Sequence, residues 1–361
     1  MRYCIFIFLL LSANSSNAQE AKVFKVETDS VSFKSADGKI VFGGTLSKPV
    51  DKKSFPTVVM VSGTGKQDRD GTMAGHKIFA QIATHLAKHG IAMLRTDDRG
   101  VGRTSGVYEM ATTGDFAKDA LAAVTYLKSR EDIDPVKIGL IGHSEGGAAI
   151  SIAAAESMDV KFLVSVAGLA MSGLDAQLKQ NEDIIAASSL PDYDKKRSNE
   201  INAIMFKTAF RYADSDSLEV RLNDAYQQWK VKDDAYFKTL NIQFDHFRFP
   251  IYSYIQNSKG PWYRYFIQYD AEKTIRCIKV PILAISGAQD LMVAPDENLA
   301  NWKNFALEGG NKKVTTVKIP GLNHLLLPCK ICDNGEVSKI QDGFSTQALT
   351  LIKDWICNTV E

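Results

Sequence analysis

Apolar, β-branched runs alternate with amphipathic helical segments along the first half of this chain. Residues 56–62, 91–96, 138–141 and 162–167 have the continuous apolar character of strands that are buried on both faces. Segments with apolar residues at helical spacing, such as 78–86, lie between them. Because each crossover between parallel strands needs a covering element, this alternation predicts an α/β fold: a mostly parallel central sheet with helices on both faces.

The alternation stops between residues 171 and 276, where charged and aromatic residues are frequent and no buried strand is evident. It resumes with apolar runs at 281–286 and 314–319. The sequence therefore predicts one core built from residues 19–170 and 277–361, interrupted by a mainly helical insertion over 171–276. The aromatic residues of this insertion are expected to form its own core and, in part, an apolar pocket.

Several polar motifs are expected to be structural. The Asp37-Gly38 pair predicts a hairpin turn between two strands. Residues 97–105 predict a tight turn held by ion pairs, and residues 67–70 predict either an ion-paired edge of the site or solvated surface. The basic run 195–197 is expected to form a solvated face.

Residues 1–18 have the pattern of a secretory signal peptide. A positive charge at Arg2 precedes the apolar run 5–11, and residues 16–18 form a small-x-small cleavage site. The apolar run is shorter than the roughly 20 residues that a spanning helix needs. We therefore expect a secreted or periplasmic protein with no stable membrane insertion after cleavage.

The net charge and the cysteine content of the chain indicate which class of partner is excluded and whether a disulfide is expected. The chain has 43 Lys and Arg against 42 Asp and Glu, so its formal net charge of +1 argues against nucleic acid as a partner. Export places four cysteines of the mature chain in an oxidising compartment. A structural disulfide is the favoured expectation, but the sequence does not choose among the pairings of Cys277, Cys329, Cys332 and Cys357.

The sequence Gly142-His143-Ser144-Glu145-Gly146 lies between a predicted strand and a predicted small-residue helix. A G-x-S-x-G turn in this context places its serine at the apex of a sharp, strained turn. Glycines flank the serine because side chains at those positions would collide with the strand and the helix. Ser144 is therefore the candidate nucleophile.

A serine hydroxyl needs a base to take its proton and an acid to hold that base. In the chain order Ser, Asp/Glu, His, the candidate base is His324, which follows a late strand, while His143 is expected to point away from the nucleophile. The candidate acid is Asp290, at the end of strand 281–286, with Asp296 as the competitor.

Two backbone N–H groups are candidates for stabilising an oxyanion. One belongs to Glu145, the residue after the nucleophile, and the other to Thr64 in the glycine-rich loop 62–66. The loop lacks the spacing of a phosphate-binding P-loop.

Five motifs together resemble the α/β-hydrolase superfamily: Gly142–Gly147, the loop from Ser62, the Asp98-Arg-Gly-x-Gly turn, Gly287–Asp290 and Gly321–His324. More narrowly, they are similar to exported bacterial esterases grouped with the serine aminopeptidase-like hydrolases. The resemblance implies a triad of Ser144, Asp290 and His324, and it implies that the insertion caps the site. One departure is Ser62, which stands where many relatives carry histidine.

The expected function is that of a secreted carboxylesterase acting on small or short-acyl esters through an acyl-serine intermediate. No cofactor and no metal is implied, and the expected partner is a small-molecule ester. The alternative is a serine exopeptidase acting on peptide N-termini, and a third possibility is a ligand-binding module without catalysis on the same fold.

Overall fold

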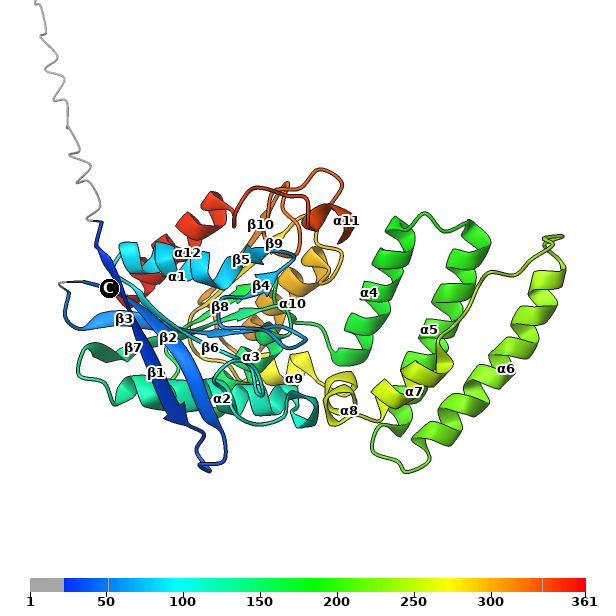
Figure 1. The fold of residues 1–361 in the computed structure, drawn as a ribbon, viewed down its shortest axis with the longest axis horizontal. Coiled ribbons are helices and arrows are strands. Elements are labelled where there is room, and N and C mark those ends of the chain that lie inside the picture. Colours follow the sequence, from blue (N-terminus) through cyan, green and yellow to red (C-terminus); the bar gives the residue numbers. More distant parts are fainter. Residues whose placement is uncertain (1–22, 51, 333) are drawn as a thin grey trace, which may run out of the picture.

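The computed structural model describes residues 23–50, 52–332 and 334–361, so the predicted signal peptide at 1–18 lies outside the described residues. Its main sheet has eight strands in the order β1-β2-β6-β3-β7-β8-β9-β10 (Figure 1). Strand β2 runs antiparallel to β1 and β6, and the neighbours from β6 to β10 are parallel. The predicted α/β class, with a mostly parallel sheet, is confirmed.

The strands of this sheet are β1 (Val26–Lys34), β2 (Val41–Pro49), β3 (Phe55–Val61), β6 (Ala92–Thr96), β7 (Ile133–His143), β8 (Leu163–Val166), β9 (Ile282–Gly287) and β10 (Val314–Ile319). A separate two-stranded hairpin consists of β4 (Thr72–Met73) and β5 (His76–Lys77). The helices of the core are α1 (Ile78–Lys88), the 3-10 helix η1 (Tyr108–Met110), α2 (Thr113–Lys128), α3 (Gly146–Glu156), α10 (Pro295–Glu308), α11 (Asn334–Val337) and α12 (Thr346–Val360).

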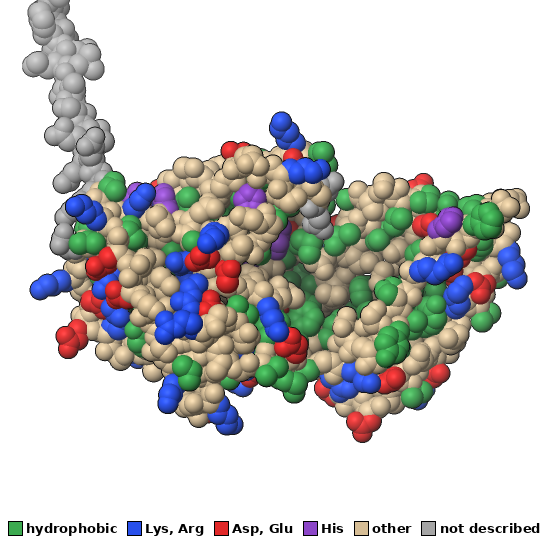
Figure 2. All heavy atoms as spheres, viewed as in Figure 1, with side chains coloured by type: hydrophobic (Ala, Val, Ile, Leu, Met, Phe, Trp, Pro, Cys, Tyr) green, Lys and Arg blue, Asp and Glu red, His purple; other side chains and the backbone are tan. Residues whose placement is uncertain are grey.

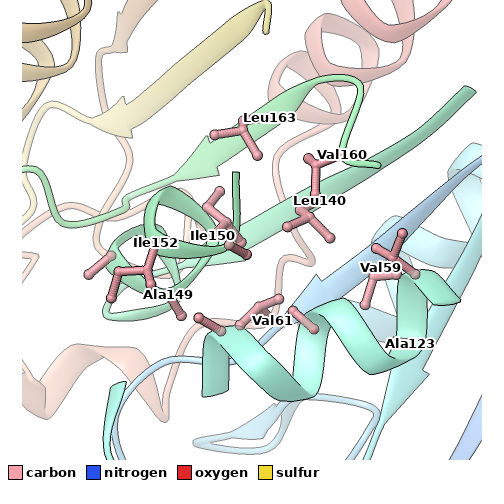
Figure 3. Close-up of a cluster of buried hydrophobic side chains, with 14 of the residues drawn as sticks. Val59, Val61, Ala123, Leu140, Ala149, Ile150, Ile152, Val160 and Leu163 are labelled. Atoms are coloured by element: carbon pink, nitrogen blue, oxygen red, sulfur yellow. The ribbon is translucent and has the colours of Figure 1, made fainter. Parts of the chain in front are cut away.

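Two apolar layers cover the sheet. Helices α1 and α12 pack on one face, and α2, α3 and α10 pack on the other. Figure 3 shows part of the second layer, where Val59 and Leu140 of the sheet lie near Ala123 of α2 and Ile150 of α3. All seven residues of β3 are buried, as a strand covered on both faces requires. This packing fixes the carboxyl ends of β3, β7, β9 and β10, where the site residues lie.

The predicted insertion corresponds to helices between β8 and β9. They are α4 (Gly173–Ala187), α5 (Asp192–Tyr212), α6 (Leu218–Lys238), α7 (Ile251–Ser258), α8 (Pro261–Ile267) and α9 (Ala271–Ile275). Helices α4, α5 and α6 stand beside the sheet-containing part, while α8 and α9 contact it (Figure 1). Figure 2 shows a hollow between the two parts. In the described part of the chain, every helix is too short or too polar to cross a bilayer.

The expectation that residues 195–197 form a solvated face is wrong for Arg197. Its side chain is only 1% exposed and pairs with Asp194, Asp233 and Asp245, at distances of 2.7–3.0 Å. Its guanidinium also lies over the ring of Phe247. These contacts join α5, α6 and the segment that follows α6. We call Arg197 and its three aspartates the Arg197 cluster.

Candidate active site

Ser144 occupies the sharp turn between β7 and α3. Its φ of 57° lies in the left-handed region, which is costly for a residue with a Cβ atom. The turn is fixed by backbone hydrogen bonds: the Ser144 N–H donates to the Val166 carbonyl, and its carbonyl accepts from the Leu169 N–H. A Cβ atom at Gly146 would lie 2.4 Å from the carbonyl oxygen of Val61, so α3 can approach β3 this closely only with glycine there.

His324 and Asp290 meet at the same edge of the sheet. His324 lies in the loop after β10, and its Nδ1 is 2.8 Å from Asp290 Oδ2. Asp290 follows β9, and its Oδ1 accepts the N–H groups of Met292 and Val293. A carboxylate held in this way fixes the ring orientation of the imidazole and leaves Nε2 for another partner. Asp296 is 75% exposed and pairs with Lys318 instead.

Ser144 and His324 line the same pocket, which has a volume of about 310 Å³. Ser144 Oγ and His324 Nε2 form no hydrogen bond with any residue that the structure describes. Bonds between a nucleophile and its base are often long before substrate binds. The structure thus brings the serine and the imidazole to one pocket, and the Asp290 carboxylate is hydrogen-bonded to that imidazole.

His143 also lines this pocket, and its ring contacts the residue that carries the candidate base. Its Nε2 is 3.2 Å from the carbonyl oxygen of His324, and the two imidazole rings are 4.8 Å apart. Burial, together with the neighbouring His324, lowers the pKa of His143 to about 3. The neutral imidazole of His143 therefore packs against the loop that carries His324. The alternation of side chains in β7 could not reveal this contact, because the His324 loop is distant in sequence.

The loop after β3 lies against the nucleophile. A Cβ atom at Gly63 would be 2.7 Å from the Cβ of Ser144, so glycine permits this approach. The Gly65 N–H donates to the hydroxyl of Tyr108 at 2.7 Å. Across the described ranges, the N–H groups of Thr64 and Glu145 have no protein acceptor, so both remain available to a bound group.

Asp98 holds the base of this loop. Ser62 Oγ donates to Asp98 Oδ1 at 2.6 Å, and the Gln67 N–H donates to Oδ2 at 2.8 Å. Burial raises the pKa of Asp98 to about 7. Ser62 therefore serves as an anchor for the loop.

Ion pairs hold the neighbouring turns, in agreement with the structural expectation for residues 97–105. Arg69 pairs with Asp97, and Arg99 pairs with Asp119 at 2.7 Å. Segment 67–70 forms an ion-paired edge of the site rather than solvated surface, because Arg69 is ion-paired and Gln67 is buried and lines the pocket.

Sequence reasoning missed the side chain of Glu145. It is 3% exposed, lines the pocket and accepts hydrogen bonds from Thr64, Thr113 and Trp262. Burial raises the pKa of this carboxyl. Only its backbone N–H could be singled out from the motif, because the three donors lie in separate parts of the chain.

The loop that follows His324 contains a disulfide. Cys329 and Cys332 are bonded, whereas Cys277 and Cys357 are unpaired.

Residues 56–328 match the family model of the alpha/beta hydrolase fold. The chain belongs to this family. Among solved structures, this α/β hydrolase is similar to the esterase Pf2001 of Pyrococcus furiosus, with a TM-score of 0.55 and 16% identity over 93% of this chain and 92% of that one. It is also similar to Est1E of Butyrivibrio proteoclasticus with bound ferulic acid, with a TM-score of 0.51 and 17% identity over 91% and 99% of the two chains. These likenesses show the fold.

Curated relatives match this α/β hydrolase over shorter stretches. Esterase EstD of Thermotoga maritima is 36% identical over 103 residues, which is 28% of this chain and 24% of the relative. Thiohydrolase apmlB of Arthrinium phaeospermum is 29% identical over 140 residues, which is 38% of this chain and 42% of the relative. The matches thus span less than half of either relative.

Proposed function

We propose that this α/β hydrolase is a serine carboxylesterase that cleaves small or short-acyl esters. The observation that carries the proposal is the 2.8 Å contact between His324 and Asp290, together with the pocket that His324 and Ser144 line. The esterase relatives point to the same chemistry.

In the proposed reaction, His324 Nε2 takes the hydroxyl proton of Ser144 as Oγ attacks the ester carbonyl. Asp290 stabilises the resulting imidazolium. The N–H groups of Thr64 and Glu145 bind the developing oxyanion. The proton passes from His324 to the leaving alkoxide, which departs as the alcohol and leaves an acyl-Ser144 ester. Water, deprotonated by His324, then releases the carboxylic acid and restores the serine.

The pocket supports a small acyl group. Its volume of about 310 Å³ is at the lower end for small-molecule sites. Apolar side chains form much of its wall, namely Leu169, Trp262, Phe266, Met292 and Val293. We further propose export, based on the leader-like sequence of residues 1–18, and a small-molecule partner rather than a nucleic acid, based on the formal net charge of +1.

The test combines a labelling reagent with a substrate panel. A fluorophosphonate should label the wild-type chain and leave Ser144→Ala unlabelled. p-Nitrophenyl acetate and butanoate should be cleaved faster than the octanoate ester, and Ser144→Ala should reduce kcat by at least about 10⁴-fold. Absence of labelling and of ester turnover would reject the proposal in favour of a binding module. Faster turnover of aminoacyl-nitroanilides would favour the exopeptidase instead.

A further inference from the structure

Glu145 carries a buried carboxylate that the proposed reaction does not use. Its Oε1 accepts hydrogen bonds from Thr113 Oγ1 at 2.7 Å and from Trp262 Nε1 at 2.8 Å. Its Oε2 accepts from Thr64 Oγ1 at 2.7 Å. The residue follows Ser144 directly, so this network begins at the nucleophile turn.

The three donors come from three different parts of the chain, and two of them, Thr64 and Trp262, line the pocket. Thr64 belongs to the loop after β3, Thr113 is the first residue of α2, and Trp262 is on α8 of the insertion. The Trp262 ring stacks on Phe266 with centroids 5.2 Å apart, and both rings line the pocket. One carboxylate thus connects the nucleophile turn to the loop at one side and to the apolar wall at the other.

All three donors are neutral, and within the described ranges no cation pairs with Glu145. Burying a carboxylate without a cation is unfavourable unless hydrogen bonds satisfy it. The interaction with these donors is therefore what makes a carboxylate tolerable at this position, and their positions are tied to it in return.

We propose that Glu145 is a positioning residue that sets the Thr64 loop and the Trp262 wall relative to Ser144. The inference rests on the proposed esterase function. Through Thr64 it holds a backbone N–H donor where the oxyanion forms, and through Trp262 it holds the wall against which the acyl chain packs. One side chain then affects both the chemical step and acyl binding.

This arrangement predicts different kinetic effects for the loss of the Thr64 contact and for the loss of the Trp262 contact. Thr64→Val removes the hydroxyl and keeps the backbone N–H, so the loop loses its hydrogen bond to Glu145. Because an oxyanion exists only beyond the ground state, kcat should fall about tenfold while KM changes less than about twofold. Trp262→Phe removes the indole N–H and keeps an aromatic ring. The loosened wall should raise KM for p-nitrophenyl butanoate about threefold or more, with a smaller effect on kcat.

Two substitutions of Glu145 test the centre of the network. Glu145→Gln keeps an oxygen acceptor for Trp262 and Thr113, and its amide can donate to the hydroxyl oxygen of Thr64. We therefore expect Glu145→Gln to change kcat and KM less than Glu145→Leu does. Glu145→Leu removes every acceptor, so it should lower kcat and raise KM together. If Glu145→Leu does not fold, the Thr64 and Trp262 variants still decide the question.

Matched controls are Thr125→Val, Glu156→Gln and Trp355→Phe. Thr125 and Glu156 are exposed, and Trp355 lies on α12 against the other face of the sheet. Each variant is compared with wild type in kcat, KM and thermal midpoint. The inference is supported if Thr64→Val mainly lowers kcat, Trp262→Phe mainly raises KM, and the controls stay close to wild type.

Two outcomes would overturn it. If wild type cleaves esters and the Thr64 and Trp262 variants behave like the controls, the network does not position the site. If Glu145→Gln selectively abolishes turnover of an amino-bearing ester while neutral esters are unaffected, Glu145 binds the substrate ammonium instead. A wild type without labelling or ester turnover would reject the proposed function itself, which is a different result.

Discussion

The backbone strain at Ser144 leads to a prediction about stability. Ser144 has a φ of 57°, and alanine at this position would keep the same unfavourable conformation. Glycine adopts it without a clash of Cβ. We therefore expect Ser144→Gly to be more stable than Ser144→Ala, although both variants lack the nucleophile and the hydroxyl.

The magnitude follows from two opposing terms. The left-handed conformation costs a residue with Cβ about 1–2 kcal/mol. Glycine gives back about 0.4–1 kcal/mol, because the unfolded chain gains conformational entropy. The expected difference in the free energy of unfolding is therefore about 0.8 kcal/mol in favour of Ser144→Gly, within a range of about 0–1.6 kcal/mol.

The assay is urea unfolding of both variants, followed by the fluorescence of the four tryptophans. The control pair is Ser253→Ala and Ser253→Gly, at an exposed position of α7. In a helix alanine is favoured over glycine by about 1 kcal/mol, so the order should reverse there. If Ser144→Ala were as stable as Ser144→Gly while the control pair behaved as expected, the turn would not be strained.

Two further predictions concern the surroundings of the site. Gly146→Ala would place a Cβ 2.4 Å from the Val61 carbonyl oxygen, so it should lower the free energy of unfolding by about 1–3 kcal/mol and reduce ester turnover. Urea unfolding and ester kinetics measure the two effects, and unchanged stability would contradict the prediction. His143 has its pKa lowered from 6.5 to about 3, so between these values the unfolded chain binds more protons and stability falls as the pH falls. Free energies of unfolding measured from pH 7 to pH 4 should show a loss of up to about 3 kcal/mol that His143→Gln removes, and identical pH profiles would refute it.

Much of the core could be predicted from local patterns. The apolar runs that became β3, β7, β8 and β9 are buried because helices cover both faces of the sheet, and such strands lack alternation. Asp290 and His324 could be singled out because the carboxyl ends of parallel strands share one edge of the sheet. That shared edge lets the two side chains come within 2.8 Å of each other.

Interactions between distant segments could not be predicted. The run at 195–197 has the composition of a solvated surface, yet Arg197 is buried by carboxylates 36 and 48 residues further along the chain. The donors to Glu145 are separated from it by 32, 81 and 117 residues. Periodicity reports which face of an element is buried, but it does not report which polar group lies opposite.

Because of the Arg197 cluster, the insertion tolerates substitution of one of the three aspartates better than substitution of the arginine. Three acidic side chains share one guanidinium, so the loss of one of them leaves the cation with two partners. Loss of the arginine would leave three neighbouring carboxylates without a counter-charge in a mostly buried place, which is far more costly. A lysine offers a point charge rather than a planar fork of donors and could not serve all three. The folding of these helices thus depends on Arg197 much more than on any one of its three aspartate partners.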